Sequence, residues 1–297
     1  KLMFVCAHPA IDTRMHTPLM LHTVLGLEAA DIARAFLLPT ATMAQRLVRA
    51  KRKIKDAAIA FEIPEPEDIP PRLSAVLEAI YGAFSSDWLE TGRMAEEAFY
   101  LVSLLAELRP SDPEVLGLFA LMAYTLSRED ARVRAGAFIP LEEQDTSLWD
   151  KDLMHRARMS LARAKAQDNL GRFQLEAAIQ AVHADRAVTG VTDWTALVQL
   201  HLGLSRIAPT IGATVGFASA LGNAVGPSEG LAALMQIDAK IRAAFAPAEA
   251  TRAHLLAELG RTPEACAAYD RAIVLTTEPF LRQYLQTKRA ALGAARQ

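Results

Sequence analysis

The chain has 297 residues, which is long enough for about two domains with substantial cores. Hydrophobic residues make up 52% of it and aromatic residues only 6%, so small and aliphatic side chains predominate, and an all-α fold is predicted. Residues 1–60 carry nine Lys and Arg against four Asp and Glu, a balance of +5, so residues 61–297 carry −7 and the formal net charge is −2. Affinity for nucleic acid is therefore expected in the first sixty residues.

Several kinds of chemistry are excluded by spacing. Cys6 and Cys266 form no CxxC pair, so we expect a reduced cytoplasmic protein with buried structural thiols. The longest small and apolar stretch, residues 211–225, is too short and too rich in glycine to span a bilayer, and no membrane partner is expected. The seven histidines lack metal-ligand spacing, and the acidic run at 141–145 has no accompanying nucleophile or phosphate-binding loop. We therefore expect no cofactor, no metal and no enzymatic activity.

Residues 27–55 predict two short helices around a tight turn, and the second helix is strongly basic. Pro39 disfavours α geometry at the residue before it, which ends the first helix, and the hydroxyl of Thr40 is expected to cap the second. The inward positions of the first helix are Ile32, Ala33 and Phe36. Because Ala33 is small, the two helices can cross closely.

The second helix has two distinct faces. Four apolar residues fall in one narrow stripe that is expected to be buried: Met43, Leu47, Ala50 and Ile54. Four others are expected to point outward: Gln45, Val48, Arg49 and Arg52. No acidic residue lies between Ile32 and Lys55, and residues 46–55 carry six Lys and Arg. Attraction to DNA phosphates is the simplest use of this cluster, and the alternative is an ordinary helical hairpin with a solvated basic face.

Residues 18–58 resemble region 4 of a bacterial sigma factor of the extracytoplasmic-function type. In that family a recognition helix of the pattern GTVxSRLxRAxxxL reads the minus-35 promoter element, and the corresponding string here is ATMAQRLVRAKRKI. Further segments resemble the subgroup with a long tetratricopeptide-like C-terminal extension: CAHPA at 6–10, IARAFL at 32–37, AQRLVRAKRKI at 44–54, LEEQDTSLWD at 141–150 and FQLEAAIQAVHA at 173–184. The chain begins after the family's region 2, so a C-terminal part of such a protein is expected.

The resemblance implies two partners, which are promoter DNA at the minus-35 element and the flap of the beta subunit of core RNA polymerase. The expected DNA-binding residues are Thr40, Thr42, Gln45, Arg46, Val48, Arg49, Lys51, Arg52 and Lys53. Gln45 and Arg49 are expected to contact bases, Val48 a base edge or methyl group, and Thr42, Lys51, Arg52 and Lys53 phosphates. For Arg46 two roles stay open, a phosphate contact or a salt bridge to Asp31.

The segment from 60 to 72 interleaves four prolines with four acidic residues, and it predicts an extended, stiff connector. We therefore expect a DNA-binding domain at 1–60, a linker at 61–71 and a helical extension at 72–297. Within the extension, Asp112 or Ser111 before Pro113 predicts a helix start, and residues 132–145 predict a small hairpin or an ordered loop.

The last third of the chain suggests helical repeats. Gly260, Ala265, Tyr269 and Ala272 have the spacing that a tetratricopeptide repeat uses for its inter-helix glycine, small residues and aromatic. The extension is therefore expected to be a degenerate repeat array that regulates the protein or binds an unknown protein or ligand. The function predicted overall is that of an alternative sigma factor. The alternatives are a repeat-type interaction adaptor and a helix-turn-helix regulator that acts without polymerase.

Overall fold

The computed structural model describes residues 1–36, 38–59, 64–86 and 93–294, and this part of the chain is almost entirely helical, which confirms the all-α prediction. The chain divides into two compact units, Lys1–Pro110 and Ser111–Gln297. The N-terminal unit contains these elements: α1 (Leu2–Cys6), the 3₁₀ helix η1 (Thr13–Met15), α2 (His16–Thr23), α3 (Ala29–Ala35), α4 (Thr40–Asp56), η2 (Pro66–Asp68), α5 (Ile69–Ser86) and α6 (Arg93–Leu108).

The C-terminal unit contains eleven α-helices among the described residues, two short strands and two 3₁₀ helices. Their bounds are α7 (Pro113–Leu126), α8 (Glu129–Arg132), β1 (Val133–Arg134), β2 (Ala137–Phe138), η3 (Leu141–Glu143), η4 (Thr146–Leu148), α9 (Lys151–Lys165), α10 (Arg172–Thr189), α11 (Trp194–Ile207), α12 (Ile211–Ala224), α13 (Pro227–Leu234), α14 (Ala239–Arg242), α15 (Ala246–Glu258), α16 (Thr262–Leu275) and α17 (Pro279–Ala294).

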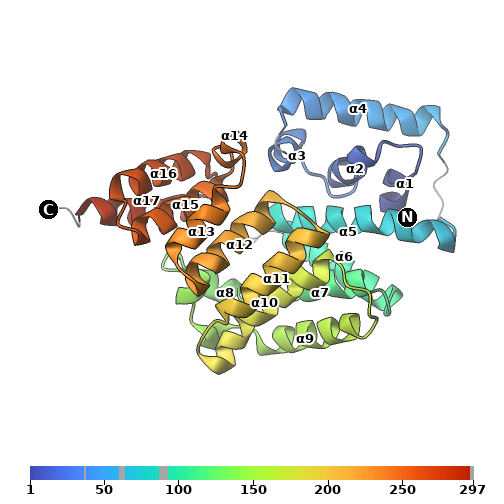
Figure 1. Ribbon diagram of the computed structural model, residues 1–297. Coiled ribbons are helices and arrows are strands. Elements are labelled where there is room, and N and C mark those ends of the chain that lie inside the picture. The colour runs from blue at the N-terminus through green and yellow to red at the C-terminus, as the bar shows by residue number, and fades with distance from the viewer. Residues whose placement is uncertain (37, 60–63, 87–92, 295–297) are drawn as a thin grey trace. The chain divides into compact units, whose positions relative to one another are not determined.

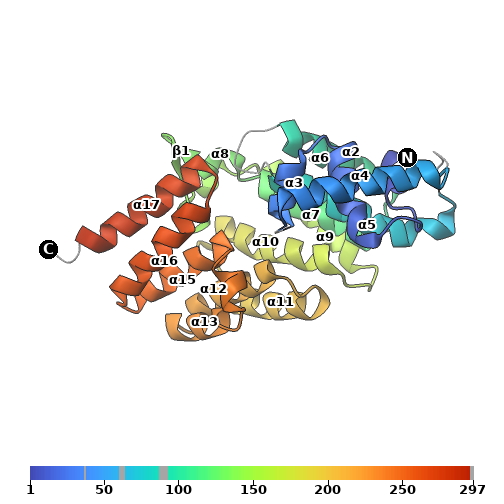
Figure 2. The same cartoon turned by 90° about the horizontal axis from the view of Figure 1, so that it is seen from above.

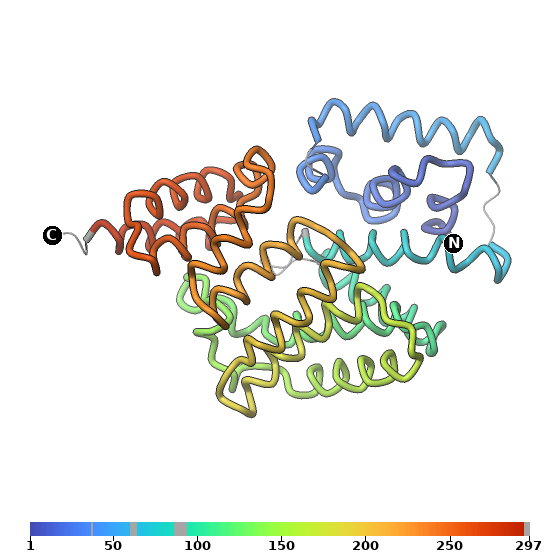
Figure 3. The backbone as a smooth tube through the Cα atoms, in the orientation of Figure 1, coloured from blue at the N-terminus to red at the C-terminus, as the bar shows by residue number. Residues whose placement is uncertain are grey.

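In the N-terminal unit, α2 lies between α4 and α5 (Figure 1). Leu19, Met20 and Leu21 of α2 are almost completely buried, so this short helix supplies apolar side chains to both neighbours. Leu21 also lies next to Gly82 of α5. Helix α4 follows α3 closely along the chain and packs against it, and Figure 3 shows the backbone of both helices. The packing fixes which face of α4 is buried.

The boundary between the compact units differs from the one expected at the proline-rich segment. Helix α5 packs against α1 and α2, and its residues Leu73, Val76 and Leu77 are buried. The stretch from 72 to 110 therefore belongs to the N-terminal unit and not to the extension. The burial of apolar side chains stabilises the packing of α5 against the first helices. The pattern of charges and prolines along the chain cannot predict such contacts.

The predicted linker is only partly extended. Its residues 61–63 lie outside the described residues, while residues 66–68 form η2 and residues 69–71 begin α5, so this half of the expected connector is helical. Pro70 and Pro71 are compatible with the start of a helix, because the N–H groups of the first turn need no acceptor within the helix. The prolines here therefore mark a helix start rather than a spacer.

The C-terminal unit is built around α7, which lies between α9 and α10. Every residue from Val115 to Tyr124 is buried, and Asp112 caps the helix by accepting hydrogen bonds from the N–H groups of Glu114 and Val115, as the sequence predicted. Residues 133–138 form a hairpin, one of the two structures predicted for 132–145, with Val133 opposite Phe138. Its Phe138 ring meets Tyr284 of α17 edge to face at 5.6 Å between centroids.

The acidic run at 141–145 has a structural role. Arg186 of α10 donates hydrogen bonds to the carbonyl oxygens of Leu141, Glu142 and Gln144, and its guanidinium lies over the ring of Trp149. These contacts fix the segment against α10 through its backbone.

Helices α15, α16 and α17 form the end of the chain, and Figure 2 shows α16 and α17 side by side. Gly260 has φ +71 in the turn before α16, a conformation that glycine adopts without strain. Ala265, Tyr269 and Ala272 are buried between the helices, together with Leu285 of α17. None of the helices in the described ranges has the length and apolar character needed to cross a membrane.

Candidate nucleic-acid interface

Helix α4 presents a buried stripe and an exposed face, as its sequence predicted. Met43, Leu47 and Ala50 are between 1% and 7% exposed, and Ile54 is half-buried. The helix has no acidic residue in its first turn, and Lys53 and Lys55 lie in its last turn. The apolar stripe anchors α4 on the N-terminal core, which leaves the opposite face directed to solvent.

The outward positions are confirmed. Gln45, Arg49 and Arg52 are exposed, and Val48 is 66% exposed although it is apolar. Lys51 and Lys53 are also exposed, whereas Thr42 and Arg46 are half-buried at the sides of the helix. The structure thus brings a hydrogen-bonding amide, a guanidinium and an apolar side chain together on one solvent-facing strip.

Two expectations about the connection between α3 and α4 are wrong. Thr40 does not cap α4, because it is already the first helical residue, and the preceding Pro39 makes no side-chain capping bond. Phe36 is 39% exposed and does not join the inner face of α3, whereas Ile32 and Ala33 are buried as predicted. Phe36 takes the position after the last residue of α3, at the end of the helix, where fewer neighbouring residues cover its side chain.

The salt bridge considered for Arg46 does not form. Asp31 instead pairs with Arg34 at 3.2 Å on the same helix, a spacing of three residues that brings side chains together within one turn. Arg52 pairs with Asp56 at 3.4 Å, but both side chains are more than half exposed, so this contact contributes little and a competing anion can displace it. Among the residues that the structure describes, Arg46, Arg49 and Lys53 form no ion pair with a carboxylate.

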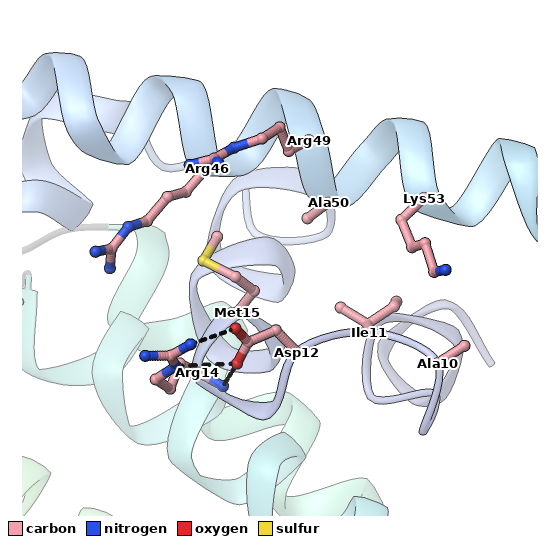
Figure 4. Close-up of a pocket in the computed structure, with 9 residues that line it drawn as sticks. All are labelled: Ala10, Ile11, Asp12, Arg14, Met15, Arg46, Arg49, Ala50 and Lys53. Atoms are coloured by element: carbon pink, nitrogen blue, oxygen red, sulfur yellow. Dashed lines mark hydrogen bonds and ion pairs between the residues drawn. The ribbon is translucent and has the colours of Figure 1, made fainter.

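A pocket lies between α4 and the segment that precedes α2 (Figure 4). Its lining residues are Ala10, Ile11, Asp12, Arg14, Met15, Arg46, Arg49, Ala50 and Lys53. Figure 4 shows the side chains of Arg46 and Lys53 leaving α4 in different directions, Arg46 past Met15 on the side of Arg14, and Lys53 on the side of Ile11. Four cationic side chains and one carboxylate therefore surround the opening.

Arg14 is the member of this group that sequence reasoning missed. Its Nε and Nη2 donate to Asp12 Oδ1 and Oδ2 at 3.1 and 2.8 Å. These bonds, together with the Arg14 N–H and the nearby Arg46, lower the pKa of Asp12 to about 2, so its carboxylate stays ionised. Arg14 stands alone among uncharged neighbours in η1, and only the charge balance of residues 1–60 hinted at its use.

A second, shallower depression lies on the outward face of α4 and is lined by Ala44, Gln45, Val48 and Arg49. Ala44 and Val48 supply apolar surface, and the two longer side chains flank it with hydrogen-bonding groups. Such a combination can receive a flat or methyl-bearing group while the amide and guanidinium hold its polar edge.

These features define a predominantly helical protein with an exposed basic helix on its N-terminal unit. Residues 72–165 match the model of a family of unknown function (DUF6596). The chain is 35% identical over 302 aligned positions to Uncharacterized protein R00370 of Rhizobium meliloti (strain 1021), and the alignment covers 99% of the chain and 71% of that protein. The chain belongs to the same family as that protein. No solved structure matches it.

Proposed function

We propose that α3 and α4 form a helix-turn-helix that reads duplex DNA, and that the chain is the promoter-recognising part of an alternative sigma factor. The observation that carries DNA binding is the outward face of α4, where exposed Gln45, Val48 and Arg49 lie opposite a buried stripe. The span from Ile32 to Lys55 holds no acidic residue, so this face repels no phosphate. A short connection and the small, buried Ala33 suit the close helix crossing of such a motif.

In this proposal α4 lies in the major groove of B-DNA, which is wide enough to admit a helix. Arg49 and Gln45 hydrogen-bond to base edges, because a guanidinium suits guanine and a carboxamide suits adenine. The depression at Ala44 and Val48 takes a thymine methyl group or another apolar base edge. Thr42, Lys51, Arg52 and Lys53 contact phosphates and hold the helix in register.

The sigma-factor assignment is supported by the resemblance of residues 41–54 to the recognition helix of that family. Under this assignment the promoter element is the minus-35 element, and the N-terminal unit also docks on the flap of the beta subunit of core RNA polymerase. The protein then acts in the cytoplasm, binds no catalytic cofactor and is not an enzyme.

The C-terminal unit is proposed to be a tetratricopeptide-like module that regulates the DNA-binding unit or binds a partner. Support comes from α15 and α16, where a glycine turn joins two helices whose facing positions are small or aromatic. Repeats of this kind bury their faces against neighbouring helices and leave extended surfaces for ligands. In this proposal the module is the second compact unit, which begins at Ser111.

Two binding experiments on the full chain separate the proposal from its alternatives. We expect the chain to bind a pool of short duplexes and to be retained by the immobilised polymerase flap. A helix-turn-helix regulator that acts without polymerase binds the duplexes and not the flap. An interaction adaptor binds neither, and that result would remove the proposal. The variant Arg206→Glu, which reverses an exposed charge on α11, serves as the control for non-specific electrostatics.

A further inference from the structure

The pocket beneath α4 collects cations from two separate segments. Arg46, Arg49 and Lys53 come from α4, and Arg14 comes from η1, about thirty residues earlier in the chain. None of the three cations of α4 forms an ion pair with a carboxylate among the described residues, although Arg46 lies near Asp12. The carboxylate of Asp12 is occupied by both donor groups of Arg14. The pocket therefore keeps an excess of positive charge that the protein itself does not neutralise.

The chemistry of the lining favours a phosphate group. Guanidinium and ammonium groups donate several hydrogen bonds to a tetrahedral oxyanion, and Arg binds phosphate with two parallel donors. Ile11, Met15 and Ala50 form the apolar part of the lining, and Met15 and Ile11 are buried. Apolar walls reduce the screening of charges by water, so an anion held between them interacts more strongly with the surrounding cations.

We propose that this pocket seats one phosphate group, which Arg14 contacts together with Arg46. A phosphate of a DNA strand bound at α4 is one source, and this case rests on the proposed function. Free inorganic phosphate is the other source of the same chemistry. The Arg14 side chain is 81% exposed and its pair with Asp12 lies at the surface, so the guanidinium can share its donors with an incoming oxyanion.

The first arm of the test measures duplex affinity of the full chain against salt. Arg14→Gln is expected to weaken duplex binding about tenfold at roughly 0.1 M salt and to reduce the log–log salt slope by about one, because one phosphate contact is lost. The matched control is Arg261→Gln. Arg261 has the same kind of exposed, two-donor pair, with Glu264, but belongs to the C-terminal unit, and its loss should leave the duplex affinity unchanged.

The second arm measures thermal unfolding of the full chain in sodium phosphate and in sodium chloride of the same ionic strength. Stabilisation by phosphate that Arg14→Gln abolishes and Arg261→Gln retains identifies free phosphate as an occupant. A weaker duplex affinity without such stabilisation identifies the DNA backbone. If Arg14→Gln and the wild type have the same duplex affinity and the same stabilisation by phosphate, the proposed phosphate site is wrong. If the wild type does not bind duplex DNA at all, the proposed function is wrong. The thermal unfolding measurement in phosphate still tests whether the pocket binds a phosphate group.

Discussion

Arg49→Glu is expected to reduce the affinity of the full chain for duplex DNA by at least about a hundredfold at roughly 0.1 M salt. The substitution removes a guanidinium that is proposed to hold a base edge through two hydrogen bonds, and such a pair contributes about 1 to 3 kcal/mol. It also places a carboxylate against the phosphates of the groove, so repulsion adds to the lost contact. Fluorescence anisotropy of a labelled duplex measures the change.

The Arg49 result can be separated from misfolding. Arg49 is exposed and has no carboxylate partner in the described part of the chain, so the variant should unfold at the wild-type temperature. Arg206→Glu makes the same charge reversal on an exposed helix of the C-terminal unit and is expected to bind nearly as well as the wild type. If both reversals weaken binding equally, only net charge matters and α4 is not the reading helix.

Gly230→Ala is expected to destabilise the C-terminal unit by about 3 kcal/mol. A methyl group at this position of α13 would lie 2.7 Å from the carbonyl oxygen of Ala218 and 2.8 Å from the Cα of Gly222, both on α12. The neighbours are backbone atoms and cannot rotate away, so the two helices must separate and lose burial along their contact. For a unit of this size the unfolding temperature should fall by roughly 6 to 12 °C.

Gly203→Ala is the matched control for this packing prediction. Gly203 lies within α11, and a methyl group there would meet Leu175 at 3.7 Å, which is an ordinary contact. Because alanine favours the helix over glycine by about 0.8 to 1.0 kcal/mol, this variant should unfold at the same or a higher temperature. A calorimetric scan in which both variants resemble the wild type would show that α12 and α13 do not approach as closely as described.

Local patterns predicted the parts of the fold that depend on neighbours along the chain. Met43, Leu47 and Ala50 follow helical periodicity, so they lie on one face of α4. That face is buried in the structure, as the pattern predicted. Asp112 before Pro113 predicted the start of α7. The carboxylate can cap the first N–H groups of a helix, and proline is compatible with the first helical turn. Local composition predicted a hairpin or an ordered loop at 132–145, and residues 133–138 form the hairpin.

Contacts between segments that are far apart along the chain could not be predicted from the sequence. Nothing near Arg14 showed that it would join Arg46 and Lys53, because the pocket exists only after η1 docks beneath α4. Helix α5 joins the N-terminal unit through its apolar face, although prolines separate it from α4 along the chain. Tertiary packing decides these cases.

The dependence of duplex affinity on salt tests the central claim, that the basic face of α4 binds DNA, most directly. The full chain is titrated against one duplex at several salt concentrations, and the logarithm of the association constant is plotted against the logarithm of salt concentration. The account predicts a slope of about −4 to −6, which corresponds to five or six phosphate contacts. An affinity that does not change with salt, or no binding at low salt, would contradict it.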